Sequence, residues 1–346
     1  MKINIFAKIK KELPSVERKV LLKEYTTFKI GGPAKYFFIA KDKEDLIKAI
    51  EVSKKYKLPI FILGGGSNIL VSDKGFNGLV IKLQILDLEI KGNQVYAGSS
   101  VMLNKLASTI SKNNFTGFEW AAGIPGTVGG AVYGNAQAFG TKISDAIDNV
   151  EVLDIKTLKF HPHTKRGQSF LSDGNTNARY GVGVKNFSKS QCKFTLKNSI
   201  FKKNKNLIVT SVVFKLEKGK EKEIKEKIDR FLKHRKTNHP ISFPSAGSVF
   251  VNPEIKIKNK KLLVKYPELN ELNKLVAIPS GYFIEKCGLK GKQIGGAKIS
   301  EKHANFIVNA GGAKAKDVLV LMNLAQKKVK QIFNVNLETE IQRIGF

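Results

Sequence analysis

The pattern of apolar and polar positions along the chain predicts interspersed helices and strands. Glu44–Lys57 and Leu103–Asn113 repeat apolar residues at the spacing of one helix face. Pro59–Leu63 and Ile69–Val71 are short apolar runs typical of strands. Further strands are expected at Asn149–Ile155, Asn206–Leu216 and Asn336–Phe346. Without internal repeats, this order indicates an α/β or α+β protein.

Two long amphipathic helices are expected in the second half of the chain. One is Lys314–Phe333. The other is Glu221–Lys236, whose apolar face consists of Ile224, Ile228, Phe231 and Leu232. Phe160–Val184 differs from both, because it is rich in Gly, Asn, Ser and Thr and has no apolar period. We expect a long loop there, and loops of this length are either functional or disordered.

Length and composition exclude several classes of protein. The 346 residues are 42% apolar, so the chain can bury a core and is not intrinsically disordered. No apolar run approaches the roughly 20 residues of a membrane helix, and lysines interrupt Met1–Lys8 before a signal-peptide core could form. Cys192 and Cys287 are too few for a disulfide scaffold or a zinc site. We expect a cytoplasmic protein without a metal.

The net charge of +31 leaves two interpretations open. It results from 60 Lys and Arg against 29 Asp and Glu, an excess that can mark a nucleic-acid-binding protein. The lysines are spread along the chain among Ile and Asn, as in Lys202–Asn206, which favours compositional drift over a selected surface. The aromatic residues lie mostly inside apolar runs and so belong to the core. Either interpretation predicts attraction of anionic ligands.

Two glycine-rich segments are candidates for a ligand-binding backbone. Gly64–Asn68 lacks the helix that follows a Rossmann loop and the Lys-Ser/Thr of a Walker loop. Gly123–Gly130 is denser, and consecutive amides free of side chains can form an anion nest for a diphosphate. Alone, Gly64–Asn68 is a weak signal that a tight turn would explain, and for Gly123–Gly130 a structural turn is an equally good interpretation. Together they favour a nucleotide-type cofactor.

Three polar positions have both a functional and a structural interpretation. Ser248 lacks the surroundings of a hydrolase nucleophile, and a structural role is the default, although a proton-donating serine needs only a fixed position. Glu338 and Glu340 lie two apart, on one face of a strand, and pattern alone favours solvent-facing carboxylates. His303 could contact a ligand or be a hydrogen-bonded polar residue.

Several motifs, read in order, resemble one family. They are Tyr25–Ala34, Gly64–Val71, Gly123–Asn135, Pro244–Pro253, Glu285–Gly291 and His303–Asn309. The chain resembles, over nearly its whole length, the UDP-N-acetylenolpyruvoylglucosamine reductases, in the compact second type of that family. The resemblance implies an α+β protein with a vanillyl-alcohol-oxidase/PCMH-type FAD-binding fold. It implies FAD-binding regions at 1–75 and 76–217 and a UDP-sugar-binding domain at 218–346, whose last strand returns to the active site.

The resemblance also implies a reaction and its residues. NADPH would supply electrons to FAD, a hydride would reach C3 of the enolpyruvyl group, and Ser248 would protonate C2. Glu340 and the residue at position 197 would stabilise the enolate-like charge. The implied substrate contacts are Asn252, His303 and Asn305. The implied cofactor contacts are Tyr25, Gly31, Gly32, Gly64, Gly65, Gly66, Ser67, Asn68, Gly123, Pro125, Gly126, Thr127, Gly129 and Gly130.

The chain departs from the family pattern at Gly134, Gln137 and Val251, and most of all at one motif. Where Tyr-Arg-x-Ser is expected, it has Leu196-Lys197-Asn198-Ser199. Lysine keeps the charge but loses the planar fork that binds a carboxylate through two hydrogen bonds. We therefore expect slower turnover, with a loss of several kcal/mol of transition-state stabilisation, by analogy with the roughly 3 kcal/mol lost with one oxyanion donor. A flavoprotein with impaired or lost reductase activity is the alternative, and a colourless nucleic-acid-binding protein is a third hypothesis. The resemblance implies a monomer acting on a small molecule, without nucleic-acid or membrane partners.

Overall fold

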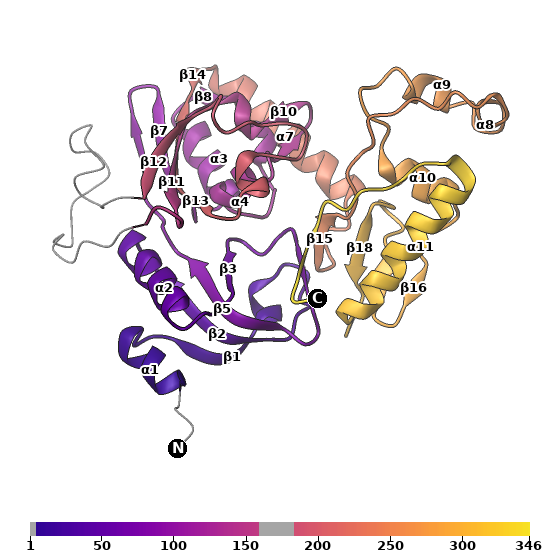
Figure 1. The fold of residues 1–346 in the computed structure, drawn as a ribbon. Helices are drawn as coiled ribbons and strands as arrows, with labels where there is room; N and C mark the ends of the chain where they lie inside the picture. The colour runs from indigo at the N-terminus through magenta and orange to yellow at the C-terminus, as the bar shows by residue number, and fades with distance from the viewer. Residues whose placement is uncertain (1–4, 159–182) are drawn as a thin grey trace. The chain divides into compact units, whose positions relative to one another are not determined.

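The computed structural model describes residues 5–158 and 183–346, which divide into two compact units (Figure 1). Unit 1 contains residues up to Val20, Lys35–Gly65 and Asn77–Leu232. Unit 2 contains Leu21–Ala34, Gly66–Phe76 and Lys233–Phe346. Each unit is therefore built from separate stretches of sequence, and helix α7 (Glu221–Asn238) crosses from the first unit to the second.

The first sheet of unit 1 has the strand order β1-β2-β5-β3. Its elements are α1 (Ile5–Glu12), β1 (Glu17–Leu21), β2 (Pro33–Ala40), α2 (Lys43–Lys55), β3 (Ile60–Leu63) and β5 (Phe76–Leu83). Strands β3 and β5 run parallel, with Leu63 opposite Lys82. Helix α2 begins at an Asp42 cap, whose side chain accepts the Asp45 N–H at 2.7 Å, and buries Leu46 and Ile50 against this sheet.

The second sheet of unit 1 is antiparallel, in the order β12-β11-β13-β7-β6. Its strands are β6 (Leu88–Lys91), β7 (Gln94–Gly98), β11 (Ile147–Asp154), β12 (Val184–Ser188) and β13 (Leu207–Lys215). The helices after Gly98 are α3 (Leu103–Lys112), η2 (Glu119–Ala121), α4 (Val128–Tyr133), η3 (Ile143–Asp145) and α6 (Ile200–Lys203). Two short ribbons complete the unit: β8 (Phe115–Thr116) with β14 (Glu217–Lys218), and β9 (Gln137–Ala138) with β10 (Thr141–Lys142). Trp120, Phe214 and Leu106 lie in the core of this half.

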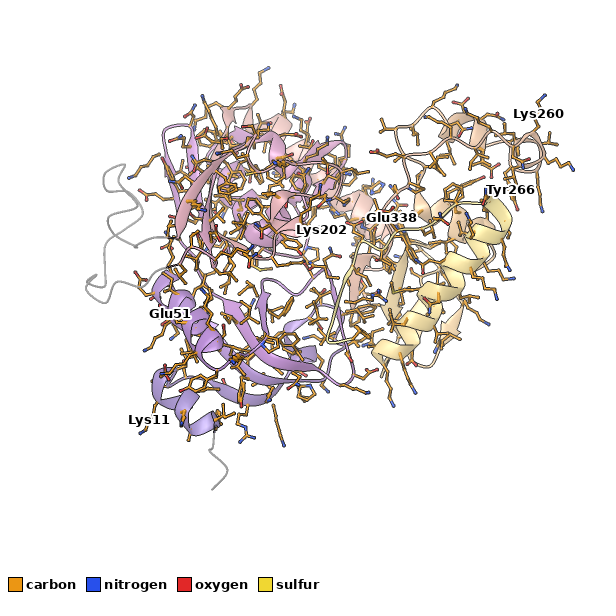
Figure 2. The ribbon with its side chains drawn as sticks, in the orientation of Figure 1. Lys11, Glu51, Lys202, Lys260, Tyr266 and Glu338 are labelled. Atoms are coloured by element: carbon orange, nitrogen blue, oxygen red, sulfur yellow. The ribbon has the colours of Figure 1, made fainter. Side chains whose placement is uncertain are left out.

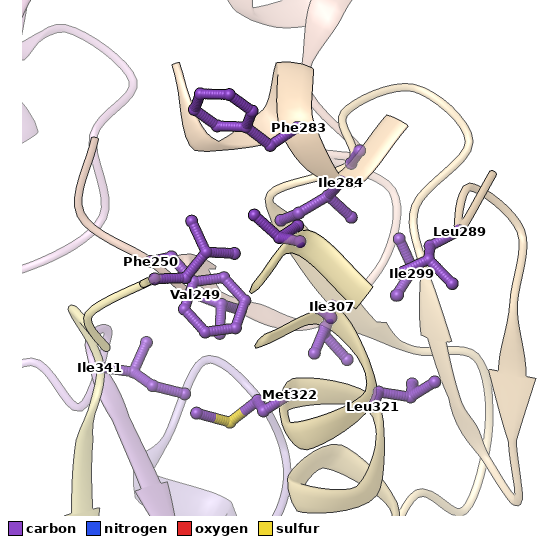
Figure 3. Packing of buried hydrophobic residues seen from close by; sticks show 14 of the residues in the cluster. Val249, Phe250, Phe283, Ile284, Leu289, Ile299, Ile307, Leu321, Met322 and Ile341 are labelled. Atoms are coloured by element: carbon purple, nitrogen blue, oxygen red, sulfur yellow. The ribbon is translucent and has the colours of Figure 1, made fainter. Parts of the chain in front are cut away.

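Unit 2 is built around a small antiparallel sheet and one long helix. The sheet has the order β15-β18-β17-β16, with β15 (Ser245–Ser248), β16 (Gln293–Ile294), β17 (Ala297–Ile299) and β18 (Phe306–Asn309). The helices are η1 (Leu22–Tyr25), α8 (Lys260–Lys265), α9 (Leu269–Leu272), α10 (Ser280–Lys286) and α11 (Ala315–Phe333). A parallel pair joins β4 (Ile69–Val71) to β19 (Gln342–Ile344). Figure 3 shows Leu321 and Met322 of α11 packed with Ile307 and Phe250 in the core.

Several sequence-based boundaries are corrected by the structure. Asn336–Phe346 was expected to be one strand, but only Gln342–Ile344 is regular, because the residues before it make a single isolated bridge, between Phe250 and Thr339. Helix α7 forms as expected, yet Leu232 on its apolar face is 41% exposed. Residues 160–182 of the expected loop Phe160–Val184 lie outside the described residues, and Val184 begins strand β12.

Candidate active site

The loop Gly64–Asn68 presents a row of backbone amides. Over residues 5–158 and 183–346, no acceptor takes a hydrogen bond from any of its five N–H groups. Successive unpaired amides form a concavity that binds anions. Glycine is required here because a Cβ on Gly65 would lie 2.9 Å from Gly126 Cα, and one on Gly64 would lie 2.9 Å from Thr127 Oγ1. The two glycine-rich segments of the sequence thus meet in unit 1.

The second glycine segment differs from the expected nest. Its amides are only partly available: Val128 N–H donates to Val101 O at 2.9 Å and Gly129 N–H donates to Ser99 O at 2.8 Å, whereas the N–H groups of Gly123, Gly126 and Thr127 have no acceptor among the described residues. Thr127 caps helix α4 by accepting the Gly130 N–H at 3.4 Å. This segment therefore shapes a cradle, which we define as the place where Gly64 and Gly65 pack against Gly126 and Thr127. The amides left for an anion belong mainly to Gly64–Asn68.

Two buried polar atoms next to the second segment have no hydrogen-bond partner within the described part of the chain. They are Ser99 Oγ and Asn135 Oδ1, on residues that are 3% and 2% exposed. A buried polar group without a hydrogen-bond partner lowers the stability of the folded protein, unless a bound molecule supplies that partner. Together with the glycine cradle, these atoms fit a bound cofactor with polar ring atoms and a diphosphate, as FAD has.

The motif that differs from the family pattern, Leu196-Lys197-Asn198-Ser199, forms a tight turn in unit 1. Thr195 and Asn198 exchange hydrogen bonds of 3.0 and 3.2 Å, and Lys197 between them has φ +52°, in the left-handed region. Two contacts tie the turn to the end of α4: Asn135 Nδ2 donates to Thr195 O at 2.9 Å, and Ser199 Oγ donates to Tyr133 O at 2.7 Å. Lys197 is half-buried, and Lys202, labelled in Figure 2, donates to its carbonyl at 3.0 Å.

The glycines of Tyr25–Gly32 and Gly66 allow close backbone packing within unit 2. A Cβ on Gly32 would lie 2.2 Å from Asp73 O, and one on Gly66, at φ +65°, would lie 2.0 Å from Tyr25 O. Gly32 N–H donates to Ser72 O at 2.9 Å, and Thr27 N–H donates to Gly66 O at 3.1 Å. These contacts explain the residue type without a ligand, so any cofactor contact by this segment is an additional role.

Ser248 lies at the end of β15, opposite Phe306 of β18. A β-bulge precedes it, where Gly247 has φ +76°. Its hydroxyl is half-buried and makes no hydrogen bond to any other described residue. The next residue, Val249, is 1% exposed in the core shown in Figure 3. A rigid backbone thus holds a hydroxyl that is free to donate a proton.

The C-terminal segment runs beside the strand of Ser248. Glu340 N–H donates to Val249 O at 2.8 Å, and Val251 N–H donates to Glu338 O at 2.9 Å. Asn68 Nδ2 donates to Glu340 O at 3.3 Å. The structure separates the two carboxylates: Glu338, labelled in Figure 2, is exposed, whereas Glu340 is half-buried and followed by the buried Ile341.

The expected substrate contacts have strong structural partners in unit 2. Both polar groups of the Asn305 amide bond the backbone of Phe250, at 3.0 and 2.8 Å, so this side chain supports the strand that carries Ser248. Asn252 Oδ1 accepts the Ser280 N–H at 2.9 Å at the start of α10. His303 Nδ1 accepts the Asn305 N–H at 3.2 Å. Burial lowers the pKa of His303, which favours its neutral form.

Some of these residues were not found by sequence reasoning. Ser99 and Asn135 carry no pattern of their own, although Asn135 ends a motif of the resemblance. Lys82, whose ammonium group donates a hydrogen bond to the Gly64 carbonyl, was also missed. It is the one charged residue of the mainly apolar strand β5, and this contrast could have marked it as a candidate.

Comparison with known proteins defines the class. A family model described as "FAD binding domain" matches residues 34–157, and one described as "UDP-N-acetylenolpyruvoylglucosamine reductase, C-terminal domain" matches residues 239–344. The reductase of that name from Clostridium novyi (strain NT) is 36% identical over 95% of this chain and 92% of its own length. The one from Caldanaerobacter subterraneus subsp. tengcongensis is 37% identical over 94% and 92%. The crystal structure of the Thermus caldophilus reductase covers 95% of this chain and 98% of its own, with a TM-score of 0.70 and 30% identity.

Fold and cradle therefore define an FAD-dependent oxidoreductase, as expected, with the α+β architecture of an FAD-binding domain followed by a C-terminal domain. The chain belongs to the UDP-N-acetylenolpyruvoylglucosamine reductase family. It reduces UDP-N-acetylglucosamine enolpyruvate to UDP-N-acetylmuramate in peptidoglycan synthesis, with FAD as cofactor and NADPH as electron donor. Its partner is thus a small UDP-sugar. Over residues 5–158 and 183–346, every helix is too short or too polar to cross a bilayer.

Proposed function

We propose that Ser248, Glu340 and Lys197 carry out the protein's part of this reduction. When bound and reduced by NADPH, the flavin would supply the hydride that C3 of the enolpyruvyl group accepts. Ser248 donates its hydroxyl proton to C2, Lys197 balances the negative charge that spreads into the carboxylate, and Glu340 orients the intermediate. The observation that carries the assignment is the backbone pairing of Glu340 with Val249, which brings the acid next to the serine's strand.

We propose that the amides of Gly64–Asn68 hold the FAD diphosphate and that Gly123–Gly130 shapes the flavin end of the cradle. The unpaired N–H groups and the buried orphans Ser99 Oγ and Asn135 Oδ1 support this assignment. The regions 1–75 and 76–217 then serve FAD, and 218–346 serves the UDP-sugar. Asn252 and His303 contact that sugar nucleotide, whereas Asn305 acts through Phe250.

Lys197→Arg tests whether the lysine that stands in place of the family's arginine limits turnover. Arginine restores two parallel hydrogen bonds to a carboxylate. The turn itself is held by contacts of its neighbours, Asn135 Nδ2 with Thr195 O and Ser199 Oγ with Tyr133 O, which the substitution leaves in place. We expect reduction of the enolpyruvyl substrate to rise by up to about 100-fold, with NADPH-driven flavin reduction unchanged.

Anaerobic reoxidation of the reduced protein by substrate measures this step directly. A wild-type chain that does not reoxidise, beside a Lys197→Arg variant that does, would establish the alternative of lost reductase activity. Equal rates for the two proteins would show that lysine serves as well as arginine here.

Glu340→Gln should slow the same step by about 100- to 1,000-fold, because a neutral amide replaces the charge that orients the intermediate. Glu338→Gln is the matched control, two residues away and exposed. Single-turnover product formation is the measurement. Normal sugar reduction by Glu340→Gln, or an equal loss in both variants, would remove Glu340 from the catalytic residues.

We also propose that the chain works as a cytoplasmic monomer without nucleic-acid or membrane partners. Its two cysteines, Cys192 and Cys287, are free thiols, which is typical of a reducing compartment. Sedimentation equilibrium should give the mass of one chain across the working range of concentration. A mass that rises with concentration would contradict the monomer.

A further inference from the structure

Lys82 is a half-buried lysine, the second-last residue of strand β5. Its neighbours Ile81 and Leu83 point into the core beneath α2, so Lys82 points to the opposite face of the sheet. Its ammonium group donates a hydrogen bond to the carbonyl of Gly64. Across residues 5–158 and 183–346, no carboxylate forms an ion pair with it.

This environment is unfavourable for a cation on its own. Burial lowers the pKa of Lys82, which shows that the charged form loses hydration without gaining a counter-charge. A buried charge without a partner is costly, and it is balanced when an anion binds nearby. The nearest candidate place for an anion is the row of unpaired amides that starts at Gly64.

The hydrogen bond also orients that row. The chain has no cis peptide bonds among its described residues, and in a trans peptide the C=O and the following N–H point in opposite directions. Because Lys82 holds the Gly64 carbonyl on one side, the Gly65 N–H points away to the other side, where no described residue accepts it.

We propose that Lys82 is a positioning residue for the diphosphate of FAD: it aims the Gly65 amide at the phosphates and places a positive charge behind it. This inference rests on the proposal that Gly64–Asn68 holds the diphosphate. It concerns the phosphates only. Lys82 therefore sets the preference for FAD over riboflavin, a flavin with the same ring and no phosphate.

Titration of the full-length apo-protein with FAD and with riboflavin tests the proposal. Lys82→Met should weaken FAD binding by about 10- to 100-fold, the loss expected for a charge-assisted interaction, and leave the Kd of riboflavin unchanged. Lys82→Arg, which keeps charge and donor, should retain most of the FAD affinity. Lys48→Met is the matched control, because Lys48 is exposed on α2, which covers the other face of the same sheet.

An equal loss for both flavins would show that Lys82 only supports the loop, and no loss for FAD would also overturn the proposal. Gly65→Val separates this failure from failure of the cradle, since its side chain would collide with Gly126. If Gly65→Val weakens FAD and Lys82→Met does not, only the role of Lys82 is wrong. If neither changes FAD affinity, the cradle itself is wrong.

A measurement on the wild-type chain covers the case in which Lys82→Met does not fold. Acetylation of lysines, followed by mass spectrometry, should show slower modification of Lys82 with FAD bound than with riboflavin bound. Equal rates with the two flavins would overturn the proposal.

Discussion

Ser248→Ala is expected to slow formation of the reduced sugar by about 100- to 10,000-fold, the range that a positioned proton donor contributes. Reduction of the flavin by NADPH should keep its wild-type rate, because that half-reaction needs no proton from the serine. The hydroxyl is half-buried, free of other described hydrogen bonds and fixed between the β-bulge at Gly247 and the buried Val249. Loss of one oxygen atom should therefore remove a function and leave the fold intact.

Stopped-flow absorbance of the flavin separates the two half-reactions. The control is Ser245→Ala, the same change three residues earlier in β15, where the hydroxyl makes only a 3.5 Å contact with Gly247 N. If Ser248→Ala reoxidises at the wild-type rate with substrate, Ser248 is not the proton donor. If Ser245→Ala is impaired to the same extent, the effect comes from distortion of the strand.

Lys43→Met is expected to lower the free energy of unfolding by about 3 to 5 kcal/mol, the cost of leaving one partner of a buried ion pair alone. Lys43 opens α2, and its ammonium lies 2.6 Å from Glu151 of β11 in unit 1. The two side chains are 8% and 9% exposed. Thr210 of β13 donates a further hydrogen bond to this carboxylate at 2.6 Å, so the network joins α2 to the second sheet.

Urea unfolding of Lys43→Met, Glu151→Leu and the double variant measures the coupling. We expect the double variant to recover most of the loss, because two apolar groups leave no unpaired buried charge. Lys48→Met, on the exposed side of α2, should change stability little. A cost below about 1 kcal/mol for Lys43→Met would contradict the buried pair and place it among surface ion pairs.

Periodicity located the regular elements well where burial is one-sided. The expected helices Glu44–Lys57 and Leu103–Asn113 match α2 and α3 to within two residues at each end, because each has a continuous apolar face. The C-terminal strand was overestimated, since the alternating residues 337–341 make one isolated bridge to residues 249–251, which follow β15, and not a regular ladder. Local pattern cannot distinguish these two origins of the same alternation.

For the candidate site, sequence motifs identified the family and most of the residues to consider. They could not predict which of those residues are free to contact a ligand and which are used within the protein. The structure assigns most of the unpaired amides of the two glycine-rich segments to Gly64–Asn68, uses those of Val128 and Gly129 internally, and commits the Asn305 amide to Phe250. Hydrogen-bond partners distant in sequence make that distinction, and no spacing rule contains them.

The sequence by itself determined the class of protein: its motifs, order and composition specify an FAD-dependent reductase of this family and reveal the lysine at position 197. Tertiary structure alone decided which carboxylate of Glu338 and Glu340 is sheltered, which buried charge is paired, and that Lys82 faces Gly64. The physical reason is that residue type and local period are properties of the chain, whereas burial and hydrogen-bond partnership arise only when distant segments pack together.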